Sequence, residues 1–171
     1  ELMAVLKPAL TARGITLPIY WGNRNWHPLL PDTLREMSAA GVKRAIAYVT
    51  SGYSSYSGCR QYREDILRAQ TEVGSGVPQV DKIRAFFNHP GFIATNVELL
   101  KSAWTKISPD RGAVAVVFTA HSIPSSMADT CDYERQLRET CRLTAEGAGL
   151  AANQWQLVFQ SRSGRPQDPW L

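Results

Sequence analysis

The chain has 171 residues, 44% of them hydrophobic and 20% charged, which is the composition of an ordinary soluble globular domain. Its formal net charge of +4 is spread along the sequence, without the basic block or aromatic-basic stripe of a nucleic-acid-binding protein. No apolar run approaches the roughly 20 residues that a spanning helix needs. We therefore expect a soluble protein with no nucleic-acid partner and no transmembrane segment.

Length and cysteine content narrow the class further. The chain is long enough for one full core and marginal for two domains. Its three cysteines, Cys59, Cys131 and Cys141, are sparse and odd in number, which fits a reducing compartment better than a disulfide scaffold. We expect a cytoplasmic location. Because the sequence starts at Glu1 without a signal peptide and stops abruptly at Leu171, we also expect a processed or truncated chain.

Helix and strand signals alternate from the first residues onward. The pattern predicts a helix over 2–12, a strand over 15–21, a helix from Asp32 or Thr33 to Gly41, and a strand over 43–50. Thr33 and Glu36 have the spacing of a capping box at the start of the second helix.

The same alternation continues through the second half. It predicts helices over 59–71, from Pro90 to Ile107 and over 133–147, and strands over 80–87, from Ala113 to Ala120 and over 154–160. Such alternation is typical of right-handed βαβ units. We therefore predict an α/β fold, a doubly wound parallel sheet with flanking helices and flavodoxin-like units, in a single unit over 1–171.

His121 ends the most apolar strand of the sequence. The run from Ala113 to Ala120 is typical of a strand buried on both faces in a parallel sheet. Ligands of such sheets bind beyond the carboxyl ends of the strands, and imidazole changes charge near neutral pH. A histidine satisfied by backbone groups is the alternative, whereas His27 and His89, each before a proline in a turn, are expected to be solvated.

Three strand-to-helix junctions are rich in polar and aromatic groups: 52–59, 120–125 and 160–170. In a parallel sheet they share one edge, so we expect them to converge on one cleft. The first junction, which contains Tyr53, is either a flexible surface turn or the lining of a large planar ligand. The sequence has no nucleophile elbow, no phosphate-binding loop and no zinc-ligand spacing.

Several segments, spread over nearly the whole length of the chain, resemble motifs of a known family, the ferrochelatases. The motifs that carry the resemblance are Gly22-x-Arg24 with Pro28, Ser54–Tyr62, Asn88-His89-Pro90-Gly91-Phe92, Thr119-Ala120-His121-Ser122-Ile123-Pro124, Ala145-Glu146-Gly147-Ala148-Gly149, Phe159-Gln160-Ser161 and Asp168-Pro169-Trp170-Leu171. The segment Ser57–Tyr62 is similar to the actinobacterial branch, whose members act on coproporphyrin III.

The resemblance implies insertion of Fe²⁺ into a porphyrin, coproporphyrin III, in heme biosynthesis, and it implies roles for particular residues. His121 matches the family's metal-site histidine and is the implied catalytic residue. The implied substrate contacts are Tyr53, Phe92 and Ser161 along the macrocycle and Arg24 near the entrance, where propionates would be met. Some members of the branch hold a [2Fe-2S] cluster, and Cys59 lies where its mid-chain ligand would fall.

The resemblance also implies missing parts. An N-terminal segment with porphyrin contacts and a metal-site glutamate after the Pro-Trp-Leu motif are expected beyond the two ends, so the chain is expected to be a ferrochelatase fragment with half of the metal site. We expect His121 to be buried, which would disfavour the imidazolium. The alternatives are a cobalt or nickel chelatase, a non-catalytic tetrapyrrole-binding protein, and an unrelated flavodoxin-like domain.

Overall fold

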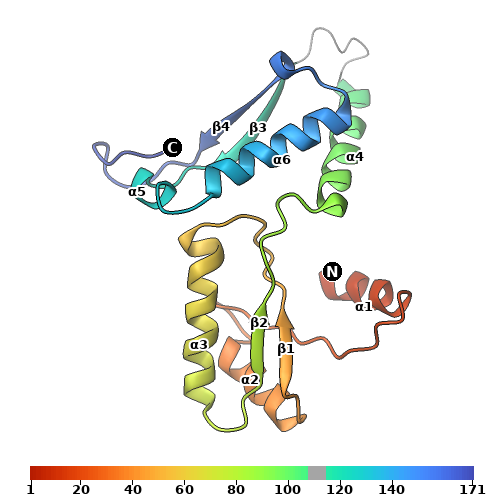
Figure 1. The fold of residues 1–171 in the computed structure, drawn as a ribbon, viewed down its shortest axis with the longest axis vertical. Helices are drawn as coiled ribbons and strands as arrows, with labels where there is room; N and C mark the ends of the chain where they lie inside the picture. Colours follow the sequence, from red (N-terminus) through yellow and green to blue (C-terminus); the bar gives the residue numbers. More distant parts are fainter. Residues whose placement is uncertain (108–114) are drawn as a thin grey trace. The chain divides into compact units, whose positions relative to one another are not determined.

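The computed structural model of the chain describes residues 1–107 and 115–171. The chain divides into two compact units, unit 1 (residues 1–47 and 64–81) and unit 2 (residues 48–63 and 82–171). Helices and strands alternate in both (Figure 1). No helix among the described residues is long and apolar enough to cross a membrane. The expectation of a single unit over 1–171 stays a prediction.

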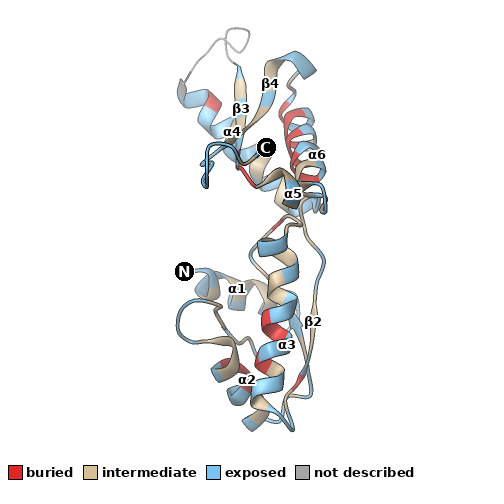
Figure 2. Ribbon diagram, turned by 90° about the vertical axis from the view of Figure 1, so that its left-hand side faces the viewer, coloured by how far each residue is buried: buried red, intermediate tan, exposed pale blue. Residues whose placement is uncertain are grey.

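Unit 1 holds a small sheet beside helices. Its elements are α1 (Leu2–Thr11), α2 (Leu30–Ala39), β1 (Arg44–Ala47), most of α3 (Gln61–Val73) and most of β2 (Gln79–Lys82). Strands β1 and β2 are neighbours in a two-stranded sheet. The core is a cluster of Leu34 and Met37 from α2 with Ala69 from α3, around which half-buried hydrophobic residues, Tyr20 among them, pack. These buried positions recur at helical spacing, which is why the two helices form amphipathic stripes (Figure 2).

Two expectations in unit 1 were wrong. Residues 15–21 form no strand; Ile15 and Leu17 are exposed, and Pro18 removes a backbone donor in the middle of the segment. The capping box is also absent, because α2 begins at Leu30 with proline in its first turn and no side-chain cap. The buried Thr33 hydroxyl instead donates to the Trp21 carbonyl at 2.9 Å.

Unit 2 holds the second sheet and the largest helices. Its elements are the π-helical turn η1 (Tyr56–Arg60), α4 (Pro90–Ile107), β3 (Val116–His121), the short α5 (Ser125–Ala128), α6 (Tyr133–Ala148), the turn η3 (Ala152–Gln154) and β4 (Trp155–Gln160). Strands β3 and β4 are parallel, from Val116 opposite Trp155 to His121 opposite Gln160. Helix α6 connects them, which makes a βαβ unit.

The buried stripe of α6 is the best-formed part of the core in unit 2. It consists of Gln136, Leu137, Thr140, Cys141, Thr144, Ala145 and Ala148. These positions repeat every four residues, from 136 to 148 and from 137 to 145, so the stripe follows one face of the helix (Figure 2). Helix α4 approaches this helix closely, since a Cβ on Gly147 would lie 2.7 Å from Val97 Cγ2.

The α/β class predicted from the sequence is confirmed, with differences in detail. The described strands pair as two sheets of two strands each. Strand β2 ends at Lys82 instead of Phe87, and Ala113 and Val114 of the predicted apolar strand lie outside the described residues. Strand β3 alternates between exposed and less exposed positions, with Val117 47% exposed, so burial on both faces was wrong for 116–121.

Candidate functional site

The candidate site of unit 2 lies at the carboxyl ends of β3 and β4. His121 is the last residue of β3, and its register partner, Gln160, is the last of β4. The next residue, Ser122, is 1% exposed. Its amide donates to the Gln160 carbonyl at 2.7 Å, and its hydroxyl donates to the Leu171 carbonyl at 2.8 Å. A buried serine therefore fixes the chain immediately after His121 to two other segments.

The segments around Pro124 and Trp170 hold each other as a short antiparallel pair. Pro124 bridges Trp170, the Ser125 amide donates to the Pro169 carbonyl at 3.0 Å, and the Leu171 amide donates to the Ile123 carbonyl at 3.1 Å. The intervening loop is closed by Arg162, which donates to the carbonyls of Pro166 and Asp168. The motifs Thr119–Pro124 and Asp168–Leu171 of the family resemblance are therefore parts of one structural element.

Tyr133, at the start of α6, connects the loop of Tyr53 to the strand end. Its hydroxyl donates to the His121 carbonyl at 3.0 Å. Its ring meets the Tyr53 ring edge-on, with centroids 6.1 Å apart. One turn further, Gln136 accepts from the Ser54 amide at 2.7 Å and donates to the Ser54 hydroxyl at 2.9 Å. The structure thus brings together the three junctions 52–59, 120–125 and 160–170, as expected from the sequence.

Both tyrosines are neutral hydrogen-bonding groups at physiological pH. Burial raises the pKa of the Tyr53 phenol, an effect that a hydrogen bond with Thr140 partly offsets. Burial likewise raises the pKa of Tyr133, and the nearby Tyr53 adds to this shift. Since an unperturbed phenol already titrates near 10, both hydroxyls keep their protons and Tyr133 remains a donor.

The Tyr53 loop is compactly folded. The Gly58 amide donates to Ser55 Oγ at 2.9 Å. A Cβ on Gly58 would lie 2.6 Å from Ser51 Oγ and 3.0 Å from the Tyr53 carbonyl, so only glycine fits there. Cys59 follows within η1, where it is half-buried and makes no disulfide. These contacts favour a built lining over a flexible surface turn for this segment.

The expected burial of His121 was wrong. Its side chain is exposed, whereas Ala120 before it and Ser122 after it are buried. Side chains alternate along a strand, and in β3 position 121 belongs to the exposed set. Residues 1–107 and 115–171 contain no group of three or more His, Cys, Asp or Glu placed to hold a metal ion. Within the described part, His121 therefore belongs to no group of three or more candidate metal ligands.

Ser161 and Phe92 occupy separate positions in unit 2. Ser161 follows β4 directly and has φ of 61°, a left-handed conformation that costs a non-glycine residue about 1–3 kcal/mol. It adjoins Gln160 and hence the end of β3 that carries His121. Phe92, in the first turn of α4, meets Phe86 edge-on at 5.3 Å, and Phe86 stacks on Tyr48 at 5.2 Å. Phe92 is thus part of an aromatic row.

Arg24 lies in unit 1, in a buried ion pair. Its Nε is 2.6 Å from Asp65 Oδ2, and the two side chains are 15% and 7% exposed. Arg68 pairs with the other oxygen of Asp65. These three residues, with Glu72 and others, line a cavity of about 180 Å³. Two guanidinium groups share the Asp65 carboxylate, and Glu72 supplies a second carboxylate to the cavity lining.

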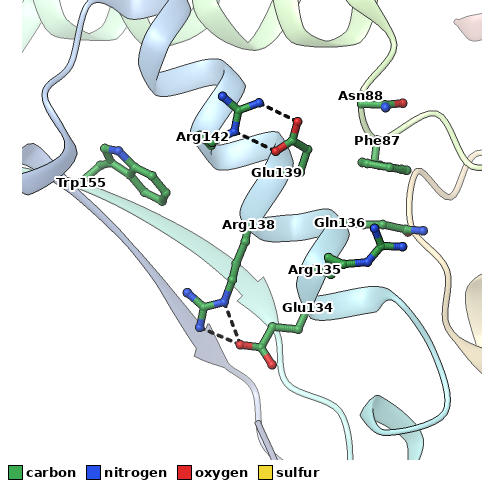
Figure 3. Close-up of a pocket in the computed structure, with 9 residues that line it drawn as sticks. All are labelled: Phe87, Asn88, Glu134, Arg135, Gln136, Arg138, Glu139, Arg142 and Trp155. Carbon is green, nitrogen blue, oxygen red and sulfur yellow. Dashed lines mark hydrogen bonds and ion pairs between the residues drawn. The ribbon is translucent and has the colours of Figure 1, made fainter.

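A larger cavity of unit 2, about 710 Å³, lies along the polar face of α6 (Figure 3). It is lined by Phe87, Asn88, Glu134, Arg135, Gln136, Arg138, Glu139, Arg142 and Trp155. Arg138 is bonded to Glu134 and Arg142 to Glu139, so these charges neutralise one another. None of the residues that the sequence predicted for the site lines this cavity.

Sequence reasoning missed Tyr133 and Gln136. The available signal was Gln136, an amide at a position that the periodicity of α6 places among buried aliphatic residues. A buried amide needs hydrogen-bond partners, so such a position indicates a specific contact. Its partner, Ser54, is 82 residues away in sequence, which no local pattern reveals.

The comparisons with known proteins agree with the resemblance. The chain matches the ferrochelatase family over residues 1–171. It is 56% identical to a ferrochelatase of Rhodopirellula baltica, covering all of this chain and 48% of that protein. It is 43% identical to a coproporphyrin III ferrochelatase of Nocardia farcinica and 41% identical to one of Mycolicibacterium smegmatis, covering all of this chain and 51% of each.

These similarities identify the family of the chain, but the match covers only part of each relative. The chain spans about half the length of the curated relatives it matches. The match covers every element described above, including both halves of the structural element around Pro124 and Trp170. The chain belongs to the ferrochelatase family.

Proposed function

We propose that the full-length protein inserts Fe²⁺ into coproporphyrin III, with His121 at the reacting centre. The observation that carries this proposal is the placement of His121. It ends a parallel strand, and its carbonyl accepts a hydrogen bond from Tyr133, whose ring contacts Tyr53. The next amide, that of Ser122, donates to Gln160, the neighbour of Ser161. Two of the relatives named above are coproporphyrin III ferrochelatases, which supports this porphyrin as the substrate.

Metal insertion requires side chains that accept protons or bind the metal ion. Two pyrrole protons must leave the porphyrin, and Fe²⁺ must shed bound water. A neutral imidazole does either job, binding Fe²⁺ through a ring nitrogen or accepting a pyrrole proton. The exposed side chain of His121 is accessible to both. We assign it one of these two roles and treat iron as a substrate.

The remaining residues are proposed to hold the macrocycle. Tyr53 and Phe92 offer aromatic faces that pack against a planar ligand, and Ser161 adds a hydroxyl beside the strand end. Aromatic walls of this kind would favour a bent macrocycle, whose nitrogen lone pairs are more open to the metal. Arg24, whose guanidinium pairs with Asp65 beside Arg68, is proposed to meet a propionate.

An iron–sulfur cluster stays a separate proposal for Cys59. A [2Fe-2S] cluster takes four cysteine ligands, and the chain has three cysteines. Cys141 is buried in the stripe of α6, and the described residues contain no group of three candidate ligands. Residues 1–171 therefore do not fit a complete cluster, and no step of the reaction is assigned to one. The free cysteines support a cytoplasmic location, which is likewise proposed.

A non-catalytic tetrapyrrole-binding protein is the second candidate. The observation that favours it is that His121 has no second and third metal-binding residue grouped with it in residues 1–107 and 115–171. It differs from the first candidate in binding porphyrin without changing it. A cobalt or nickel chelatase differs from both in the metal that it inserts.

Anaerobic metallation of porphyrin by the full-length protein tests these candidates together. Coproporphyrin III and protoporphyrin IX are each mixed with Fe²⁺, Co²⁺ or Ni²⁺, and loss of free-porphyrin fluorescence is followed over time. We expect the fastest turnover with coproporphyrin III and Fe²⁺. Binding without metallation would support the second candidate, and preference for Co²⁺ or Ni²⁺ over Fe²⁺ would overturn the assignment of iron.

A further inference from the structure

The first turn of α6 forms a bracket between two parts of the candidate site. One arm is the Tyr133 hydroxyl, which donates to the His121 carbonyl at 3.0 Å. The other arm is Gln136, which makes two hydrogen bonds to Ser54, next to Tyr53. Both arms come from one helical turn, so they are held at a fixed separation.

The Tyr133 bond acts on the peptide that carries His121. The parallel ladder of β3 and β4 reaches its last pair at His121 and Gln160. The Ser122 amide is fixed by the Gln160 carbonyl at 2.7 Å, and the His121 carbonyl on the same peptide is fixed by Tyr133. With its amide hydrogen and its carbonyl both bound, this peptide cannot rotate without losing a hydrogen bond. The direction of the Cα–Cβ bond of His121 is thereby set.

The ring of Tyr133 contacts the loop that carries Tyr53. It packs edge-on against Tyr53 with centroids 6.1 Å apart, while Gln136 holds the neighbouring Ser54. Hydroxyl and ring thus have separate tasks, because the hydroxyl bonds to the strand end and the ring contacts the loop. A substitution that removes only one of them separates the two tasks experimentally.

We propose that Tyr133 is a positioning residue for metal insertion, whose hydroxyl orients His121 and whose ring orients Tyr53. This inference rests on the proposed function. It predicts that the hydroxyl governs the chemical step, because it acts on His121, and that the ring governs binding of the porphyrin, because it acts on Tyr53. A misplaced His121 would slow metal insertion, whereas the contact of Tyr53 with the porphyrin would be unchanged.

The test compares Tyr133→Phe and Tyr133→Leu in the full-length protein, with coproporphyrin III and Fe²⁺ as substrates. Tyr133→Phe loses only the hydroxyl, and we expect kcat to fall about five- to tenfold, the loss of one hydrogen bond, with KM for porphyrin unchanged. Tyr133→Leu also loses the ring contact, so we expect KM for porphyrin to rise as well. Tyr20→Phe, a hydroxyl deletion in the core of unit 1, is the matched control and should leave both constants unchanged.

The outcomes separate this inference from the function on which it rests. If the unsubstituted protein inserts iron and Tyr133→Phe keeps its kcat, the positioning role is refuted and the proposed function stands. If Tyr133→Phe lowers the melting temperature and changes kcat and KM in proportion, the role is merely structural, and the inference is also refuted. If the unsubstituted protein inserts no metal, the proposed function fails first and this inference falls with it.

Discussion

Gln136 uses both polar atoms of its side-chain amide in hydrogen bonds to one residue, Ser54. Its side chain is 6% exposed, and it bonds to the amide and the hydroxyl of Ser54. We expect Gln136→Leu to lower the free energy of unfolding by about 1–3 kcal/mol, because the half-buried Ser54 amide is left without a partner. Urea denaturation followed by circular dichroism measures the change. The control is Gln156→Leu at an exposed position of β4, and an equal effect of both substitutions would contradict this account.

Cys141 makes stability depend on pH in the alkaline range. Burial raises the pKa of its thiol to about 11 from the ordinary value of 9.0. The folded protein therefore keeps a proton that the unfolded chain releases, so the stabilisation is complete below pH 9 and is lost as the pH rises through 11. The loss amounts to about 3 kcal/mol.

The comparison with Cys141→Ala isolates this thiol. Tyr53 and Tyr133 have raised pKa values and act in the same direction, so the unsubstituted protein alone cannot assign the effect. We expect the free energy of unfolding to fall less steeply between pH 9 and 11 in Cys141→Ala. Identical slopes would show that the thiol does not contribute.

For single residues, the sequence could predict the place in a helix or strand better than the burial and contacts of the side chain. His121 follows an apolar run, and that pattern alone placed it at a strand end, which is correct. Its exposure could not be predicted, because it depends on which face of β3 is covered. The hydrogen bond from Tyr133 was also beyond prediction, since it depends on the angle at which α6 returns to β3.

At the level of elements, the contact between α4 and α6 depends on a glycine. A Cβ on Gly147 would lie 2.7 Å from Val97 Cγ2, and the branched valine has little freedom to move. We expect Gly147→Ala to destabilise the protein by about 1 kcal/mol, because a clash of about 1–3 kcal/mol exceeds the gain in helix propensity.

A double substitution tests the cause of that loss. In Gly147→Ala with Val97→Ala, the clashing methyl is removed, so we expect the alanine at position 147 to become neutral or stabilising. Thermal unfolding of the two single variants and the double variant measures this coupling. Additive effects would mean that the close approach of the helices does not limit residue 147.

Elements with strong periodicity were predicted well. Helices α4 and α6 and strand β4 lie within one or two residues of their expected bounds. The strand expected over 15–21 was wrong, because an apolar run there is interrupted by Pro18 and lies on the surface. Short apolar runs do not distinguish a strand from an irregular segment, since pairing with a neighbour decides between them.

For the whole molecule, we expect residues 1–171 and the full-length protein to differ in activity. No group of three metal-binding residues occurs in the described part, and the chain covers about half of its relatives. We expect residues 1–171 alone to bind coproporphyrin III weakly at most and to insert iron at a negligible rate. Absorbance titration followed by addition of Fe²⁺ measures both, and turnover equal to that of the full-length protein would contradict this expectation.

The proposed role of His121 at the reacting centre is tested by His121→Ala in the full-length protein. His27→Ala, at another exposed histidine, is the matched control. Coproporphyrin III is bound first, and Fe²⁺ is then added while the absorbance of the metallated porphyrin is recorded. We expect His121→Ala to bind the porphyrin but to form no metallated product, whereas His27→Ala behaves as the unsubstituted protein. Metallation by His121→Ala at an undiminished rate would contradict the claim.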